Sequence, residues 1–456
     1  MHIHILGICG TFMAGVAAIA REAGHRVTGS DRDVYPPMSD QLAALGITVT
    51  EGYAAGQLQP APDVVIVGNV MSRGIPVVEE LLNRGIPYCS GPEWLAREVL
   101  RSRHVIAVSG THGKTTTSSL VAWILSQAGC DPGYLIGGVT PDLGVSARLG
   151  RGDAFVIEAD EYDTAFFDKS AKFLHYRPRT LVINNIEYDH ADIYPDLAAI
   201  QRQFHLLVRA VPGEGRIICR ADDANIRQVL DQGCWTPVET FASRTGIAAD
   251  WTGRVADDGG YQLSQAGREA GLCAWRLAGD HNAENVTAAL LAARHVGVDI
   301  AVSLAAVARF GGVKRRLELL GTWDGVRLYD DFAHHPTAIE RTLAAVRTTL
   351  RPQRILAVME PRSNTMKIGV HRDTLAHALA RADSSWILRQ EGLRWDLAAT
   401  LAGVPSARIC PDTATIVAEV ARECRAGDVI VVMSNGGFQN IRADLAAALA
   451  ARARRN

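Results

Sequence analysis

The stretch HVIAVSGTHGKTTT, residues 104–117, decides the fold. Residues 104–108 are mostly apolar and typical of a buried strand, residues 109–117 form a glycine-bearing loop, and residues 118–127 continue as an amphipathic helix. A strand, a glycine-bearing loop and a helix in this order are the context of a phosphate-binding loop, because backbone N–H groups at the helix start face the phosphates. The stretch therefore predicts an α/β fold with a nucleoside triphosphate site.

The residue types in this loop support the same prediction. Lys114 supplies a compact cation for the terminal phosphates, and the Thr115 hydroxyl can ligate Mg²⁺. The motif is a variant, because Val108 stands where glycine is common and Gly110 takes that role. A glycine- and threonine-rich helix cap is the alternative, but it leaves Lys114 unexplained. We expect the nucleotide to contact Gly110, Thr111, His112, Gly113, Lys114, Thr115 and Thr116.

Acidic residues follow two further predicted strands. Strand 155–157 delivers EADEYD, residues 158–163, and strand 181–183 delivers NNIEYDH, residues 184–190. Open α/β sheets place ligands at the carboxyl ends of their strands, and carboxylates are hard oxygen ligands for Mg²⁺. Solvated loop faces are the alternative, but the position of both clusters after buried strands favours a metal site.

The N-terminal stretch IHILGICGTFMAGVAAIA, residues 3–20, carries no charged residue and could be mistaken for a signal peptide. No Lys or Arg precedes it, and its glycines interrupt the apolar run. Residues 3–6 and 26–29 instead predict two strands around a helix over 11–23. This β-α-β unit predicts a nucleotide turn at Gly7, Ile8, Cys9, Gly10 and Thr11, with Ser30 and Asp31 after the second strand. The glycine spacing is imperfect, so an ordinary Rossmann-like turn is the alternative.

The rest of the chain predicts two more regions. Residues 235–278 contain short, glycine-broken segments that predict a β-rich appendage. Residues 325–329, 354–359 and 428–433 predict strands, and residues 336–348 predict a helix, which together indicate a C-terminal Rossmann-like domain. We therefore expect three domains, over residues 1–103, 104–313 and 314–456.

Composition narrows the function classes. The 456 residues are 48% hydrophobic and 21% charged, and 47 Lys and Arg against 49 Asp and Glu give a net charge of −2. These values argue against wholesale disorder and against a polybasic nucleic-acid binder. The eight cysteines are scattered singly, without metal-site or disulfide-framework spacing. We expect a cytoplasmic protein with reduced thiols that binds no nucleic acid or membrane; the oligomeric state is not indicated.

Several motifs together resemble one family. They are GTHGKTTT, EADEYD, NNIEYDHAD, DHNAEN (280–285), KRRLE (314–318) and DDFAHHPT (330–337), and in this order they resemble the Mur ligases, the ATP-dependent amide-forming enzymes of peptidoglycan metabolism. HILGICGTFM, VYPPMS (34–39), EYDTAFFD, MEPRSNTMK (359–367) and MSNGGF (433–438) are most similar to the recycling branch. That branch joins UDP-N-acetylmuramate to the tripeptide L-Ala-γ-D-Glu-meso-diaminopimelate. The branch that adds L-alanine is the nearest alternative.

The resemblance implies a site, a mechanism and ligands. ATP and Mg²⁺ would activate the lactyl carboxylate of UDP-N-acetylmuramate as an acyl phosphate, which the peptide amine attacks. The catalytic residues implied are Lys114, Glu158, His190, Arg316 and Asp331. Asn282, Asn285, Arg316, Asp331 and His334 would join the phosphate loop in binding ATP, and Thr115, Glu158 and His190 would bind Mg²⁺. The UDP-sugar would lie at Gly7, Ile8, Cys9, Gly10, Thr11, Ser30 and Asp31.

Other expectations are less closely fixed. Arg362, Ser363, Asn364 and Lys367 follow a predicted strand and are candidates to bind the acceptor carboxylates, although a polar loop is the alternative. Several Mur ligases carry a carbamylated lysine after the DH segment, but residues 191–215 contain no lysine. A dinucleotide-dependent oxidoreductase and a non-catalytic nucleotide-binding regulator are the alternatives from other classes. Because Lys114 and Arg316 lie in different predicted domains, we also expect ATP to bridge them and the third domain to move.

Overall fold

The computed structural model describes residues 1–34, 38–244, 246–256 and 259–454. The chain divides into two compact units, which are treated separately. Unit 1 comprises Met1–Glu187, Leu197–Trp275 and Glu284–Gly311, and unit 2 comprises Tyr188–Asp196, Arg276–Ala283 and Gly312–Asn456. Residues 35–37 of the VYPPMS segment lie outside the described residues. Within the described ranges, every helix is too short or too polar to cross a lipid bilayer.

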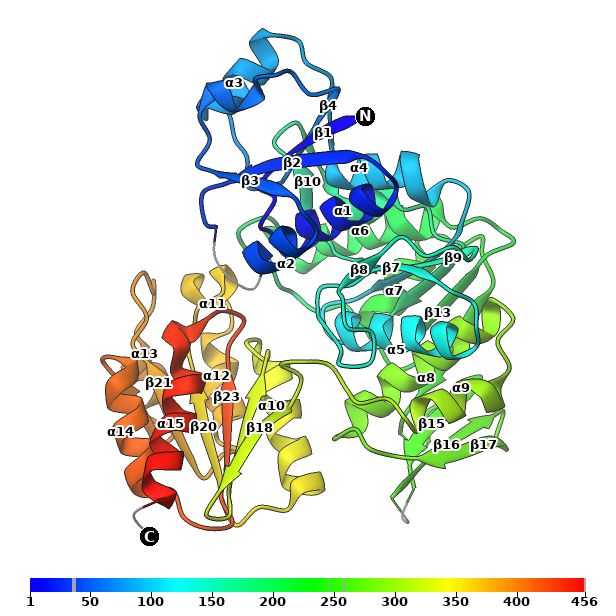
Figure 1. Cartoon of the computed structure of the whole chain (residues 1–456). Coiled ribbons are helices and arrows are strands. Elements are labelled where there is room, and N and C mark those ends of the chain that lie inside the picture. The colour runs from blue at the N-terminus through cyan, green and yellow to red at the C-terminus, as the bar shows by residue number, and fades with distance from the viewer. Residues whose placement is uncertain (35–37, 245, 257–258, 455–456) are drawn as a thin grey trace. The chain divides into compact units, whose positions relative to one another are not determined.

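The N-terminal part of unit 1 contains a five-stranded parallel sheet in the order β3-β2-β1-β4-β5 (Figure 1). Its strands are β1 (His2–Leu6), β2 (Arg26–Asp31), β3 (Thr48–Glu51), β4 (Val64–Val67) and β5 (Tyr88–Ser90). The connecting helices are α1 (Thr11–Glu22), α2 (Met38–Ala44), η1 (Ala55–Leu58), α3 (Pro76–Asn83), α4 (Gly91–Leu95) and η2 (Ala96–Leu100). The predicted β-α-β unit is confirmed, since the uncharged stretch forms the buried β1 and most of α1.

The same unit contains a ten-stranded sheet in the order β17-β16-β15-β14-β13-β12-β6-β9-β7-β8. Its strands are β6 (His104–Ser109), β7 (Gly133–Leu135), β8 (Ala147–Arg148), β9 (Ala154–Ala159), β12 (Thr180–Ile183), β13 (Arg216–Arg220), β14 (Val238–Ala242), β15 (Trp251–Val255), β16 (Gly260–Gln265) and β17 (Arg268–Ala274). The helices are α5 (Lys114–Gln127), α6 (Leu197–Ala210), α7 (Ala224–Asp231), α8 (Asp280–His295) and α9 (Ile300–Val307), and a hairpin of β10 (Asp163–Ala165) and β11 (Asp168–Ala171) leads into η3 (Lys172–His175).

The predicted appendage over 235–278 needs a correction. Its residues are β-rich as expected, but they continue the central sheet, because β14 pairs in parallel with both β13 and β15. The strands β15, β16 and β17 then extend that sheet as an antiparallel meander. The region is therefore the edge of the sheet that contains β6, and not a separate attachment.

Unit 2 contains a six-stranded sheet in the order β18-β19-β23-β20-β21-β22. Its strands are β18 (Glu318–Trp323), β19 (Val326–Asp331), β20 (Ile355–Met359), β21 (Ser384–Leu388), β22 (Ala407–Cys410) and β23 (Val429–Met433). The helices are α10 (Pro336–Ala345), η4 (Val346–Leu350), α11 (Asn364–Ile368), α12 (Arg372–Leu379), α13 (Leu397–Leu401), α14 (Thr413–Glu423), η5 (Phe438–Asn440) and α15 (Ile441–Ala453). The predicted C-terminal Rossmann-like arrangement is confirmed, with β18 as an additional antiparallel edge strand.

Alternation along the central strands of unit 2 builds two hydrophobic layers. On β20, Ile355 and Ala357 pack in the layer of α10 and α12, whereas Leu356 and Val358 pack in the layer of α14 and α15. Successive side chains of a strand point to opposite faces, so a continuous apolar run fills both layers. Figure 1 shows these strands in yellow to red with the helices packed around them. The sheet thereby presents the carboxyl ends of β19, β20 and β23 at one edge.

Candidate functional site

The phosphate loop leaves β6 and enters α5 through two glycines with positive φ. Gly110 has a φ of +129° and Gly113, the residue before α5, has a φ of +82°. A correction concerns the helix start, because residues 114–117 form the first turn of α5 and do not belong to the loop. The helix is also largely buried, so it is less amphipathic than the sequence predicted. Lys114 and Thr115 therefore project from the end of a helix that carries partial positive charge.

The segment after β12 holds this loop in place. The Asn185 side-chain oxygen accepts the His112 N–H at 2.8 Å, and the Asn185 backbone oxygen accepts the Thr111 N–H at 3.1 Å. The Thr111 hydroxyl in turn accepts the Glu187 N–H at 2.8 Å. The cluster 184–190 was expected to contribute to a metal site, which stays a prediction. These contacts show that Asn185 and Glu187 in it also brace the loop backbone.

A second brace explains the need for glycine at position 113. A side chain there would begin 2.4 Å from the Asn285 amide oxygen and 2.9 Å from the Asn184 amide nitrogen. Thr117 donates to the Asn285 oxygen at 3.2 Å, and Asn184 donates to the Thr117 hydroxyl at 3.1 Å. The structure thus places the predicted residue Asn285 directly against the phosphate loop. Asn282 lies one turn earlier on α8, in the part that belongs to unit 2.

Lys114 lies among carboxylates. Its Nζ donates to the Gly110 backbone oxygen at 2.7 Å and lies 3.4 Å from Glu161 and 3.5 Å from Asp160. Burial by itself would lower the pKa of Lys114, whereas Glu161 and Asp160 raise it, and the net effect is a pKa above the ordinary value. The ammonium is therefore charged and is held at the loop by groups of the protein itself.

Glu158 and Thr115 offer the oxygen atoms that Mg²⁺ prefers. Glu158 is 7% exposed at the end of β9, and its carboxylate accepts the Gly137 N–H at 2.7 Å. The Thr115 side chain is also buried, in the first turn of α5. Hard oxygen donors are the ligands that Mg²⁺ prefers. The two predicted ligands that belong to unit 1, Thr115 and Glu158, therefore suit Mg²⁺.

The third predicted metal ligand, His190, belongs to unit 2. It has a φ of +54° and follows Asp189, whose carboxylate accepts the His190 N–H at 2.8 Å and the Thr365 hydroxyl at 2.7 Å. Burial by itself would raise the pKa of Asp189, but His190 and Thr365 lower it well below the ordinary value. The role of Thr365 could not be found from the sequence, because its partner is 176 residues away. The joining of Thr115, Glu158 and His190 in one metal site stays a prediction.

Three more predicted ATP contacts lie in unit 2. Asp331 ends β19, and its carboxylate accepts the Leu317 N–H at 2.7 Å and the Ala333 N–H at 2.8 Å. Burial raises the pKa of Asp331, against the opposing effect of Arg316. The Arg316 guanidinium lies 4.9 Å from the centre of the Phe332 ring, and His334 approaches the Phe332 backbone oxygen at 3.0 Å. Asp331 thus shapes the turn that carries Arg316 and His334.

The four acceptor candidates fall into two groups. The Ser363 hydroxyl caps α11 by accepting the Met366 N–H at 3.2 Å, and Asn364 donates to Asp192 at 2.8 Å. Within the described part of the chain, no hydrogen bond or ion pair involves the side chains of Arg362 and Lys367. Ser363 and Asn364 therefore support local structure, and the two cations are the better candidates for binding carboxylates.

The N-terminal turn is closed by its own hydrogen bonds. The N–H groups of Gly7 and Ile8 donate to the Ser30 oxygen, and the Cys9 N–H donates to the Asp31 carboxylate at 2.7 Å. Asp31 also accepts from the Tyr53 hydroxyl at 3.3 Å. Burial and the nearby Asp31 raise the pKa of Cys9 to about 11, so its thiol stays protonated. Asp31 therefore holds the turn closed. The contact of Asp31 with the UDP-sugar stays a prediction.

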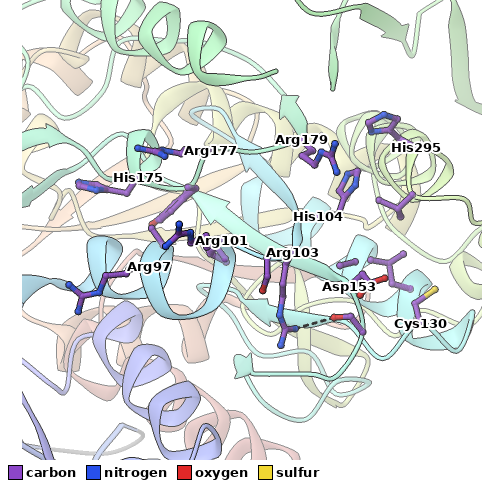
Figure 2. A pocket seen from close by; sticks show the side chains of 18 of the residues that line it. Arg97, Arg101, Arg103, His104, Cys130, Asp153, His175, Arg177, Arg179 and His295 are labelled. Carbon is purple, nitrogen blue, oxygen red and sulfur yellow. Dashed lines mark hydrogen bonds between the residues drawn. The ribbon is translucent and has the colours of Figure 1, made fainter. Parts of the chain in front are cut away.

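A separate hollow of about 1600 Å³ lies at the other end of the central strands (Figure 2). It surrounds His104, the first residue of β6, so it lies about 16 Å along that strand from the phosphate loop. Arg103 donates there to the backbone oxygens of Leu149 and Gly150, and Thr180 joins His104 and His295 through its hydroxyl. These contacts tie strand ends and loops together. None of the predicted site residues lines this hollow.

Comparisons with known proteins cover almost the whole chain. Residues 2–103 match the model "Mur ligase family, catalytic domain", residues 108–293 the "Mur ligase middle domain" and residues 315–436 the "Mur ligase, glutamate ligase domain". A UDP-N-acetylmuramate–L-alanyl-γ-D-glutamyl-meso-2,6-diaminoheptandioate ligase of Escherichia coli (strain K12) is 52% identical over 457 residues, which is 99% of each chain. A UDP-N-acetylmuramate–L-alanine ligase of Roseiflexus castenholzii is 35% identical over 462 residues, 96% of this chain and 95% of that one. A crystal structure of a murein peptide ligase from Psychrobacter arcticus is 44% identical, with a TM-score of 0.77 and 99% of each chain covered.

Proposed function

The chain belongs to the Mur ligase family, and from this premise we propose that it joins UDP-N-acetylmuramate to L-Ala-γ-D-Glu-meso-diaminopimelate with consumption of ATP. The observation that carries the proposal is the 52% identity, over 99% of each chain, to the Escherichia coli ligase of that name. The charged Lys114 at the start of α5 supports the ATP-dependent step. The reaction would serve the recycling of peptidoglycan peptides in the cytoplasm.

The proposed reaction has two steps. The carboxylate of the lactyl group attacks the γ-phosphorus of ATP, which forms an acyl phosphate and releases ADP. The amine of the tripeptide then attacks the acyl carbon; the C–O bond to phosphate breaks, phosphate leaves, and the amine loses a proton. Because both reactants are anions, positioning and neutralisation of charge must contribute much of the rate acceleration.

Neutralisation of phosphate charge, metal binding and acceptor binding can each be assigned to residues of the described chain. Lys114 would neutralise the terminal phosphates of ATP, and the first turn of α5 would direct its N–H groups at them. Thr115 and Glu158 would hold Mg²⁺, with His190 as a further ligand, and the ion would neutralise phosphate charge. Arg362 and Lys367, near the carboxyl end of β20, would bind the acceptor carboxylates. A guanidinium suits a carboxylate because it can donate two parallel hydrogen bonds.

A coupled assay of ADP release tests the proposal. Purified protein is supplied with ATP, Mg²⁺ and UDP-N-acetylmuramate, and either the tripeptide or free L-alanine. We expect ADP release with the tripeptide and a product of the corresponding mass. Release with L-alanine alone would favour the synthetic alanine ligase, which the 35% identical relative represents.

The same preparation tests the two alternatives from other classes. A nucleotide-binding regulator would form no ADP with any peptide acceptor. A dinucleotide-dependent oxidoreductase would bind NAD(P) tightly and would keep that binding after Lys114→Ala. Either result would contradict the proposed ligase activity.

A further inference from the structure

The hollow at the amino ends of the central strands is lined by arginine side chains (Figure 2). Its lining residues all belong to unit 1, and its volume of about 1600 Å³ is larger than the roughly 300–1000 Å³ of ordinary small-molecule sites. Among the described residues, two carboxylates line it, those of Glu93 and Asp153. Five arginines line it: Arg97, Arg101, Arg103, Arg177 and Arg179. Positive charge is thus concentrated here, although the whole chain has a net charge of −2.

Two short basic segments bring most of these arginines together. The sequence RSR, residues 101–103, precedes β6, and the sequence RPR, residues 177–179, precedes β12. The strands β6 and β12 are parallel neighbours, and the Arg179 N–H donates to the Val105 oxygen at 3.0 Å. Parallel neighbours start at the same edge of a sheet, so the two segments meet although they are far apart in the sequence.

The protein itself uses part of this positive charge. Arg103 donates to three backbone oxygens in the segment 149–152 and so holds the rim of the hollow. Arg97 and Arg179 each have one carboxylate neighbour, and both arginine side chains are 53% exposed. Exposed ion pairs contribute little to stability, so a more highly charged anion can replace these carboxylates at small cost.

Arg101 and Arg177 are used by nothing in the part of the chain that the structure describes. Both side chains are exposed, and neither takes part in a hydrogen bond or an ion pair there. Arg177 also has a φ of +44° and stands directly before Pro178, where a left-handed backbone is unfavourable for a residue with a side chain. Glycine would adopt this conformation at lower cost, so the backbone gives no reason for an arginine at this position.

The chemistry of the lining favours phosphate groups. A guanidinium donates parallel hydrogen bonds to phosphate or carboxylate oxygens, and a phosphate offers more negative charge and more acceptor oxygens than a carboxylate does. Several arginines around one hollow therefore suit a ligand with more than one phosphate. A hollow can also surround a small ligand, whereas a flat lipid surface would contact only its rim.

We propose that this hollow binds a small anion with two or more phosphate groups, through Arg101 and Arg177 with Arg97 and Arg179 beside them. The site lies at the opposite end of β6 from the phosphate loop. Because open α/β sheets bind their substrates at the carboxyl ends of the strands, an anion at the amino ends acts as an effector. It would tie the segment after η2 to the start of β12. This inference goes beyond the proposed ligase activity and does not depend on it.

Hydrogen exchange followed by mass spectrometry tests the inference on the full-length protein, with sodium tripolyphosphate as the probe. We expect backbone amides within residues 97–103 and 173–179 to exchange at least about fivefold more slowly with the probe, because binding suppresses local opening. The phosphate loop, residues 109–117, can bind the same probe, but its peptides are read separately. An ATP analogue with Mg²⁺ should protect the loop and leave the two basic segments unchanged.

A double variant, Arg101→Gln/Arg177→Gln, removes the two arginines that have no partner in the described chain. The probe concentration for half-maximal protection of the two segments should rise at least about tenfold, since each lost bond to a charged group contributes more than about 1.4 kcal/mol. The matched control, Arg202→Gln/Arg227→Gln, removes the same charge from exposed positions of α6 and α7 outside the hollow. Its value should stay within about twofold of wild type.

Several results would overturn the inference. One is an unchanged half-maximal concentration in the double variant, and another is a wild-type protein whose basic segments stay unprotected while the probe saturates the phosphate loop. Protection at lower concentrations of citrate would exclude phosphate as the preferred group, and protection at lower concentrations of a single-stranded oligonucleotide would indicate a nucleic-acid surface instead. If the double variant did not fold, Arg177→Gly, which suits the left-handed backbone, would take its place, with an expected rise of at least about threefold.

Discussion

Lys114 combines a short bond to the Gly110 backbone oxygen with two carboxylate neighbours, so its charge is fixed at the phosphate loop. We predict that Lys114→Ala lowers kcat for ADP release by at least about 10²-fold, since removal of one preorganised charge-stabilising group typically costs that much. ATP binding should weaken as well. Steady-state ADP release, with Lys169→Met as the matched surface control, provides the measurement. A variant that kept a tenth of the wild-type rate would contradict the role of Lys114.

His4 gives a prediction on pH and stability. Burial lowers the pKa of His4 to about 4, and its two ring nitrogens lie 2.9 Å from the hydroxyls of Thr28 and Ser30. In the unfolded chain the pKa returns to about 6.5, so the unfolded state takes up the proton first as the pH falls. Neutral His4 makes its full contribution to the free energy of unfolding above pH 6.5. This contribution is lost as the pH falls from 6.5 to 4, and the loss is at most roughly 3 kcal/mol.

Scanning calorimetry of wild type and His4→Gln from pH 7 to 4.5 measures the pH dependence of the unfolding temperature. The glutamine side chain does not titrate, so the variant is the reference. We expect the variant to be less stable than wild type at pH 7 and the difference in unfolding temperature to shrink on acidification. Parallel curves for the two proteins would show that His4 does not titrate with the folding transition.

Contacts between residues close in sequence could be predicted, whereas contacts between distant residues could not. Lys114, Thr115 and Gly113 follow one strand directly, so chain order alone placed them at one helix start. The bracing role of Asn185 was not foreseen, because the sequence could not show that its amide would meet the backbone of His112. That contact depends on the parallel pairing of β12 with β6, which brings together residues about 75 positions apart.

At the scale of elements, α11 holds the segment that carries His190. The Thr365 hydroxyl donates to Asp189 at 2.7 Å and accepts the Ala191 N–H at 3.3 Å, so one group fixes both sides of His190. Thr365→Val keeps the side-chain volume and removes this hydroxyl. A buried hydrogen bond to a charged group contributes about 1.5–3 kcal/mol.

We predict that Thr365→Val lowers kcat of the ligation about tenfold, because a free-energy loss of about 1.4 kcal/mol corresponds to a tenfold effect on rate. The affinity for an ATP analogue should change little, since the phosphate loop is untouched. Thr365→Ser, which keeps the hydroxyl, should restore most of the rate. Equal losses in the Val and Ser variants would indicate that packing of the methyl group matters and not the hydrogen bond.

Strands and helices were foreseeable where the hydrophobic pattern is local. Apolar runs predicted β6, β20 and β23, and the uncharged N-terminal stretch predicted β1 and α1. The strand β18 was missed because Leu319 and Leu320 are exposed at the sheet edge, and only pairing with β19 makes that segment a strand. For the same reason β15, β16 and β17 could be recognised as β-structure but not assigned to the central sheet.

At the scale of the whole molecule, the chain crosses between its two compact units more often than a linear series of domains would require. Tyr188–Asp196 and Arg276–Ala283 belong to unit 2, although residues on both sides of each segment belong to unit 1. Both segments carry predicted site residues, His190 and Asn282. Domain borders at residues 103 and 313 stay a prediction, since residues 1–187 form a single compact stretch of unit 1.

This division leads to a prediction about closure. Lys114 and Thr115 lie in unit 1, whereas Arg316, Asp331 and His334 lie in unit 2, and all five are expected to contact one ATP molecule. A nucleotide that binds groups on both units favours the arrangement in which those groups converge, so the ligands should shift the population toward a more compact molecule. Small-angle scattering should therefore show a smaller radius of gyration with an ATP analogue and UDP-N-acetylmuramate together than without ligands. Lys114→Ala should reduce this response at equal ligand concentration, and a wild-type profile unchanged by both ligands would refute an ATP site shared by the two units.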